Sequence, residues 1–206
     1  MFLSGIGRGR SSYKKFISLT PSSYDLHFLN STFLMHDGHD RAIGEIENFL
    51  DRNRLEAISL AGHSLGGGLA ILYASSYPKR VKHLYLLDSI GINEQKSFVY
   101  HMVHFLRRPI NEAVKDLKVL PTAIKHPMLL SKLSYYVRSI DLQNEAANIK
   151  VPTIIIWGEK DVLIPVRHAR KLANLIKKSK VIILPKVGHD WPVHNPELFW
   201  ENIKNG

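Results

Sequence analysis

The sequence predicts an α/β fold, a mostly parallel sheet with helices on both faces, interrupted by a helical insertion. Apolar runs of strand length take turns with helical patterns along the chain, which is typical of a sheet covered on both faces. The chain has 206 residues, 45% of them hydrophobic, enough to bury the core of one domain. Between residues 91 and 150 helical segments separated by prolines replace the alternation. We therefore expect a core over 1–90 and 151–206 with a helical lid over 91–150.

The expected elements follow one another in a regular order. Strands are expected at residues 1–7, 24–30, 57–62, 81–88, 151–158 and 180–185. Helices are expected at 11–19, 40–54, 65–77 and 166–178, in the insertion at 97–106, 110–117 and 128–140, and from about Glu197 onward. The pattern of helix 40–54 is the clearest, because Ile43, Ile46, Phe49 and Leu50 form one stripe, and Asp40 is expected to cap its start.

Composition and charge argue against several classes of partner. The net charge is +10, but Lys and Arg are spread along the chain, so we expect a solvated basic surface and no nucleic-acid partner. No apolar stretch approaches the roughly 20 residues of a membrane span, and the first ten residues have too short an apolar core for a secretory signal. There is no cysteine, and therefore no disulfide or thiolate site. The cytoplasm is the default location.

One polar segment gathers possible metal ligands. MHDGHD, residues 35–40, contains His36, Asp37, His39 and Asp40. A mobile polar loop accounts for these residues, and we expect no metal.

The stretch AGHSLGGGLA, residues 61–70, places one serine between glycines where a strand is expected to end and a helix to begin. A residue on so sharp a turn takes strained backbone angles, and Gly62 and Gly66 let the strand and the helix approach closely. The turn presents the hydroxyl of Ser64 to solvent. It also aims the N–H of Leu65, at the positive end of the helix, at the place where an oxyanion would form.

This stretch resembles the nucleophile elbow, G-x-S-x-G, of the α/β-hydrolase superfamily. WGEKDVLIP, residues 157–165, resembles the acid loop of that family and implies Asp161 as the acid. VGHDWP, residues 187–192, resembles its histidine loop and implies His189 as the base. Ser64, Asp161 and His189 then occur in the family's chain order of serine, acid and histidine. Asp88, at the end of an earlier strand, stays open as an alternative acid.

The resemblance implies a lid-bearing serine hydrolase, of the esterase or lipase kind, that cleaves a small-molecule acyl substrate through an acyl-enzyme and needs no cofactor. The second oxyanion donor would be the backbone N–H of Ile6, in LSGIG, where Ser4-Gly5 replaces the family's His-Gly. Thioesterase, amidase and carbon–carbon hydrolase activities use the same groups and stay open. The alternative from another class is a non-catalytic α/β-hydrolase-like binding or interaction protein.

The resemblance covers nearly the whole chain but begins at the third strand of the family. The fold is therefore expected to be shortened at the N-terminus, with strand 24–30 at an open edge of the sheet. An uncovered edge presents unpaired backbone groups to an extended partner. Self-association through this edge is accordingly expected.

Overall fold

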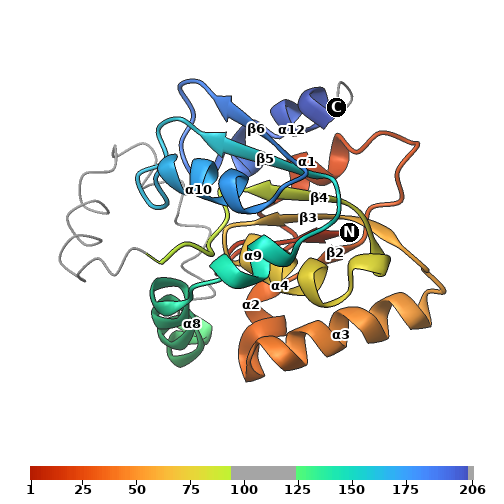
Figure 1. Ribbon diagram of the computed structural model, residues 1–206. Helices are drawn as coiled ribbons and strands as arrows, with labels where there is room; N and C mark the ends of the chain where they lie inside the picture. Colours follow the sequence, from red (N-terminus) through yellow and green to blue (C-terminus); the bar gives the residue numbers. More distant parts are fainter. Residues whose placement is uncertain (94–123, 204–206) are drawn as a thin grey trace.

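The computed structural model describes residues 1–93 and 124–203. At its centre lies a six-stranded sheet in the order β2-β1-β3-β4-β5-β6, in which every neighbouring pair is parallel (Figure 1). The strands are β1 Phe2–Leu3, β2 Phe28–Leu29, β3 Ile58–His63, β4 Val81–Leu87, β5 Thr153–Gly158 and β6 Ser179–Leu184. The expected parallel sheet is confirmed, and β2 lies at its edge.

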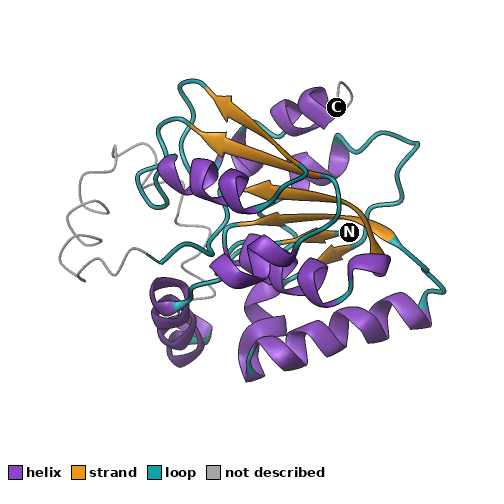
Figure 2. Cartoon of the chain, in the orientation of Figure 1, coloured by secondary structure: helices purple, strands orange, loops and turns teal. Residues whose placement is uncertain are grey.

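Helices separate the strands along the chain and cover both faces of the sheet (Figure 2). The α-helices are α1 Lys14–Ser18, α2 Ser31–Leu34, α3 His39–Arg52, α4 Leu65–Ser76, α8 Pro127–Ser139, α9 Gln143–Asn148, α10 Arg167–Leu175, α11 Trp191–His194 and α12 Glu197–Ile203. Two 3-10 helices are η1 Met35–Asp37 and η2 Pro78–Arg80. Within residues 1–93 and 124–203, no helix combines the length and the apolar character that a membrane crossing requires.

Two apolar cores form because successive side chains of a strand point to opposite faces. In β1, for example, Leu3 belongs to one core and Phe2 to the other, and both are fully buried. The first core joins the sheet to α3, α4, α9 and α10. The second joins it to α1, α11 and α12 through aromatic side chains, Phe16, Trp191, Phe199 and Trp200. The two layers of helices hold the carboxyl ends of the strands at one edge of the molecule.

The first two strands are much shorter than expected. β1 ends at Leu3 because the chain then turns into a loop whose N–H groups bind partners outside the sheet, such as the hydroxyls of Tyr13 and Thr32. β2 comprises only Phe28–Leu29, where 24–30 was expected. Within residues 1–93 and 124–203 its backbone pairs with β1 alone. Self-association through this edge stays a prediction.

The expectation of a mobile polar loop at residues 35–40 is wrong. Met35 is buried in the first core and begins η1, and Asp37 pairs with Arg41 one helical turn later. α3 starts at His39, so Asp40 lies in its first turn, and the residue at the cap is Gly38 with φ 103°. Asp40 therefore does not cap the helix as expected.

Only part of the insertion lies within the described residues. The helices expected at 97–106 and 110–117 fall outside them. The helix expected at 128–140 is α8, which buries Leu129 and Leu133 and packs against α2 and η1. From residue 124 to 150 the structure contains helices and no strand. The division into a core and a lid stays a prediction.

Candidate active site

Ser64 occupies a strained turn between β3 and α4. Its backbone angles are φ 54° and ψ −114°, a region that non-glycine residues rarely adopt. Its N–H donates to the carbonyl of Leu87 at the end of β4 (3.0 Å), and its carbonyl accepts from the N–H of Ile90 (3.2 Å). Backbone hydrogen bonds on both sides therefore hold the strained residue in place.

The two glycines beside Ser64 are required by close backbone contacts. A Cβ atom on Gly62 would lie 2.3 Å from the carbonyl oxygen of Gly66. A Cβ atom on Gly66 would lie 2.3 Å from the carbonyl oxygen of Leu3 in β1. No side chain can replace either hydrogen without moving the backbone. The G-x-S-x-G spacing thus follows from the packing of α4 against β3 and β1.

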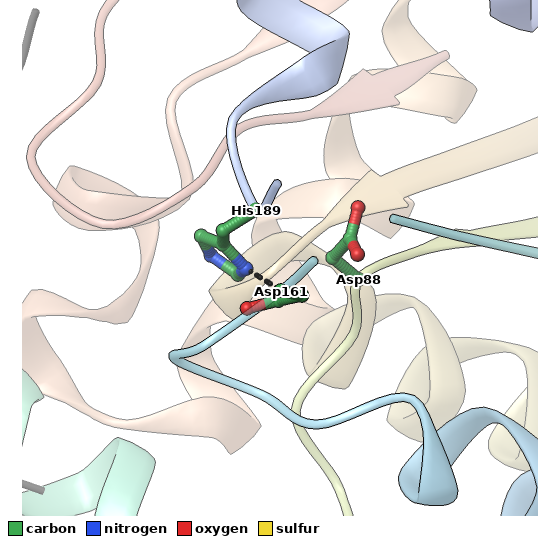
Figure 3. A group of neighbouring side chains, drawn as sticks. All are labelled: Asp88, Asp161 and His189. Atoms are coloured by element: carbon green, nitrogen blue, oxygen red, sulfur yellow. Dashed lines mark hydrogen bonds and ion pairs between the residues drawn. The ribbon is translucent and has the colours of Figure 1, made fainter. Parts of the chain in front are cut away.

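Asp161 and His189 form a buried hydrogen-bonded pair. Asp161 follows β5 and His189 follows β6, and His189 Nδ1 lies 2.7 Å from Asp161 Oδ2 (Figure 3). The other oxygen, Oδ1, accepts from the N–H groups of Leu163 and Ile164, each at 2.8 Å. Both oxygens of the carboxylate are therefore hydrogen-bonded, and the bonds to Oδ1 orient Oδ2 toward the imidazole.

The pKa of His189 is raised by its acidic neighbour. Burial is the largest influence and lowers the pKa, but the charge and the hydrogen bond of Asp161 together outweigh it. Because Asp161 accepts from Nδ1, the Nε2 atom of the neutral ring is left as a proton acceptor. This is the state that a general base requires.

Ser64 lies, like this pair, at the carboxyl ends of the strands, and its neighbour His63 contacts His189 directly. His63 Nε2 bonds to the carbonyl oxygen of His189 at 3.0 Å, and the two imidazole rings have their centroids 5.0 Å apart. Among the described residues, Ser64 Oγ makes no hydrogen bond to the His189 ring. The structure therefore pairs Asp161 with His189 and brings the residue before Ser64 into contact with His189.

Asp88, the alternative acid, lies next to the pair, but the carboxylate that bonds to His189 Nδ1 is that of Asp161. Asp88 follows β4, is fully buried, and accepts from the N–H of Gly158 at 2.9 Å. Its Oδ2 has no hydrogen-bond partner in the described part of the chain. Burial, and then the charge of Asp161, raises the pKa of Asp88 well above its usual range, which favours the protonated form of this carboxyl group.

The donor atoms of Asp88, Asp161 and His189 lie within 4.8 Å of one another, a spacing that a cation could bridge. The 2.7 Å contact between Asp161 and His189 needs a proton between the two atoms, and Asp161 Oδ1 is already occupied by two N–H groups. The arrangement is therefore that of a hydrogen-bonded acid and base, with Asp88 beside them.

Ile6 and Leu65, the expected oxyanion donors, both offer an N–H group. In the loop after β1, the N–H groups of Ser4, Gly5, Gly7 and Arg8 donate to Leu29 O (3.2 Å), Tyr13 Oη (2.9 Å), Thr32 Oγ1 (2.8 Å) and Gly5 O (3.3 Å). For the N–H of Ile6, and for that of Leu65 at the start of α4, residues 1–93 and 124–203 provide no hydrogen-bond acceptor. Their role as oxyanion donors stays a prediction.

Four residues around the site were not anticipated from the sequence. Arg8 and Asp190 form a buried ion pair of 2.7 Å that ties the loop after β1 to the loop of His189. Tyr13 and His63 are buried and hydrogen-bonded to each other at 2.6 Å. His63 and Asp190 are direct neighbours of Ser64 and His189, which is the only sequence signal that could have pointed to any of them.

Comparison with known proteins places this geometry in context. A family described as alpha/beta hydrolase fold matches residues 9–118, just over half of the chain. Lipase 1 of Psychrobacter immobilis is 28% identical over 158 residues, 64% of this chain and 50% of the lipase. Monoacylglycerol lipase ABHD6 of Bos taurus is 26% identical over 196 residues, 78% of this chain and 57% of that protein. The chain thus spans about half the length of these curated relatives.

A solved structure extends the likeness to nearly the whole chain. The meta-cleavage product hydrolase from Pseudomonas fluorescens IP01 superimposes with a TM-score of 0.72, covering 98% of this chain and 88% of that one. The sequence identity is 16%, so this match concerns the fold.

Proposed function

The chain belongs to the α/β-hydrolase family, and its curated relatives include lipases. We therefore propose that it is a serine hydrolase that cleaves an ester or a related acyl bond. The observation that carries the proposal is the 2.7 Å hydrogen bond between Asp161 and His189, buried at the sheet edge that also holds the strained Ser64. A carboxylate, an imidazole and a serine in this setting are the groups that nucleophilic acyl transfer needs.

Acylation of the enzyme follows from the roles of these groups. Ser64 Oγ attacks the carbonyl carbon of the substrate while His189 Nε2 takes the hydroxyl proton. The negative charge of Asp161 stabilises the imidazolium that forms. The N–H groups of Ile6 and Leu65 bind the oxyanion of the tetrahedral intermediate. The intermediate collapses, the alcohol leaves with the proton of His189, and an ester of Ser64 remains.

Deacylation repeats these steps with water as the nucleophile. His189 takes a proton from water as the water attacks the acyl carbon, and the same N–H groups bind the second oxyanion. Collapse returns the proton to Ser64 Oγ and releases the carboxylic acid. None of these steps uses a cofactor.

The esterase or lipase type is supported by the curated relatives, whose names include Lipase 1 and Monoacylglycerol lipase ABHD6. We propose a small-molecule acyl ester as the substrate class on that basis. The division into a core and a lid, with the lid over 91–150, and the cytoplasmic location stay predictions.

A fluorophosphonate probe tests the proposal directly, because it forms a phosphorus–oxygen bond only with an activated serine and releases fluoride. We expect the folded protein to be labelled, Ser64→Ala to lose the label, and Ser75→Ala, in α4 away from the turn, to keep it. Hydrolysis of short-chain and long-chain p-nitrophenyl esters then measures the acyl preference. A folded wild-type protein that is not labelled would refute the proposal and favour the non-catalytic binding protein.

A further inference from the structure

Two buried side chains that the proposed reaction does not use, Tyr13 and His63, connect the two loops on either side of Ser64. Tyr13 directly precedes α1 and is fully buried; its ring packs against Phe2, with centroids 4.9 Å apart. Tyr13 Oη lies 2.6 Å from His63 Nδ1 and accepts the N–H of Gly5 at 2.9 Å. His63 Nε2 lies 3.0 Å from the carbonyl oxygen of His189.

The direction of every hydrogen bond in this series is determined by its last member. A carbonyl oxygen can only accept, so Nε2 of His63 must carry a proton. Burial, the largest influence, together with the nearby His189, lowers the pKa of His63 to about 3, so the ring is neutral and Nδ1 is a bare acceptor. The hydroxyl of Tyr13 must then donate to Nδ1. Burial raises the pKa of Tyr13, which keeps its proton.

The series thus runs in one direction, from the N–H of Gly5 through Tyr13 and His63 to the carbonyl of His189. Gly5 is the residue before Ile6, and the carbonyl belongs to the proposed base itself. Tyr13 and His63 therefore link the backbone beside one oxyanion donor to the backbone of the base.

We propose that Tyr13 and His63 are positioning residues that hold the oxyanion donor at Ile6 and the base at His189 in register with Ser64. The role rests on the proposed function. Interactions that act on the oxyanion and on the proton in transfer are used in the transition state, so losing their alignment lowers kcat. In the proposed mechanism neither Tyr13 nor His63 binds the substrate itself, so KM is expected to change little.

The first test is Tyr13→Phe, which keeps the ring and removes only the hydroxyl. Gly5 N–H and His63 Nδ1 both lose their partner. Removal of a whole oxyanion donor costs about 10²–10³-fold in kcat, and because Tyr13→Phe would only misalign the donor, we expect kcat for a p-nitrophenyl ester to fall by about 10-fold or more with little change in KM. The matched control is Tyr73→Phe. Tyr73 is also fully buried, and its hydroxyl donates to Glu47, away from the site. This control should lose stability and keep kcat.

A second variant pair serves if Tyr13→Phe does not fold. The amide of a glutamine can reach the position of Nε2 and donate to the His189 carbonyl, whereas leucine cannot donate at all. His63→Gln is therefore expected to retain more kcat than His63→Leu. Equal kcat values in the two variants would overturn the proposal.

Nitrogen-15 NMR of the imidazoles gives a measurement that does not depend on turnover. The wild-type protein should show His63 in the Nε2–H form throughout pH 5 to 8, and Tyr13→Phe should move the Nδ1 resonance of His63. An Nδ1–H form, or a kcat of Tyr13→Phe equal to that of Tyr73→Phe, would overturn the proposal. Failure of the proposed function is distinguished from this result, because then the wild-type protein itself hydrolyses no ester.

Discussion

The backbone of Ser64 predicts that the proposed nucleophile lowers the stability of the fold. A non-glycine residue held at φ 54° and ψ −114° is strained, and strain of this kind costs of order 1–3 kcal/mol. Ser64→Ala removes the hydroxyl and keeps the Cβ atom, whereas Ser64→Gly removes both. The difference in the free energy of unfolding between these two variants therefore isolates the strain.

The expected difference in the free energy of unfolding is the strain energy minus the entropic cost of glycine in the unfolded chain. Glycine loses about 0.5–1 kcal/mol relative to alanine because the unfolded chain has more backbone freedom. Taking the middle of both ranges, Ser64→Gly should be more stable than Ser64→Ala by about 1 kcal/mol. A change of that size in a chain of this length corresponds to roughly 2–4 °C in Tm. Differential scanning calorimetry of the two inactive variants measures it.

Ser75, which is helical and lies in the last turn of α4, provides the matched control. In a helix, glycine is less stable than alanine by about 1 kcal/mol, so Ser75→Gly should melt below Ser75→Ala. The sign of the alanine-to-glycine difference should therefore reverse between the two positions. A Ser64→Gly variant that melts below Ser64→Ala would refute the strain argument.

The remaining predictions concern the acid, the base and the sheet edge. Ser64→Ala and His189→Ala should each lower ester hydrolysis by about 10⁴-fold or more, with the double variant little worse because the two act as one unit; losses that multiply would contradict this. The kcat/KM profile should fall as the pH drops through an apparent pKa above the ordinary value of about 6.5. Asp161→Asn should lower both kcat and that pKa, since it removes the charge that raises the pKa of His189 most and leaves burial as the largest influence. The pKa of Asp88 is raised in the fold, so with rising pH the unfolded chain loses this proton first, and the wild-type protein is destabilised above about pH 4. In urea titrations, Asp88→Asn should therefore gain stability relative to wild type between about pH 4 and pH 7. A stability of Asp88→Asn that instead falls relative to wild type over this range would show that Asp88 is ionised. Because β2 pairs only with β1 in the part of the chain that the structure describes, we expect a dimer or larger species in size-exclusion chromatography. A stable monomer would contradict that expectation.

The order of the strands and the residues at their carboxyl ends could be predicted because the signals are local. β5 and β6 are continuous apolar runs bounded by turns, and α3 has a single apolar stripe. Ser64 directly follows β3, and Asp161 and His189 lie in the loops after β5 and β6, so their position at the carboxyl ends of the strands follows from the parallel sheet. The hydrogen bond between Asp161 and His189 agrees with that reasoning.

What could not be predicted depends on contacts between distant segments. Arg8 and Asp190 are 182 positions apart, and no periodicity relates them. β1 is short because the loop after it binds Thr32 and Tyr13, which a strand pattern does not reveal. The start of α3 at His39 depends on the burial of Met35 beneath it. Whether Asp88 or Asp161 pairs with His189 depends on the geometry of the loops, which the sequence does not reveal.

The second apolar core also has a consequence for how the protein is made. Trp191, Phe199 and Trp200 follow His189 closely. The rings of the last two pack at a tilt against Phe16 of α1, with centroids 5.1 and 5.2 Å from it. During synthesis the chain leaves the ribosome from its N-terminus, so Ser64 can reach its turn while the base is still untranslated. A nascent chain would then carry the nucleophile without a proton acceptor and remain inert. In a translation extract, hydrolysis would therefore begin only after the segment that carries His189 has left the ribosome.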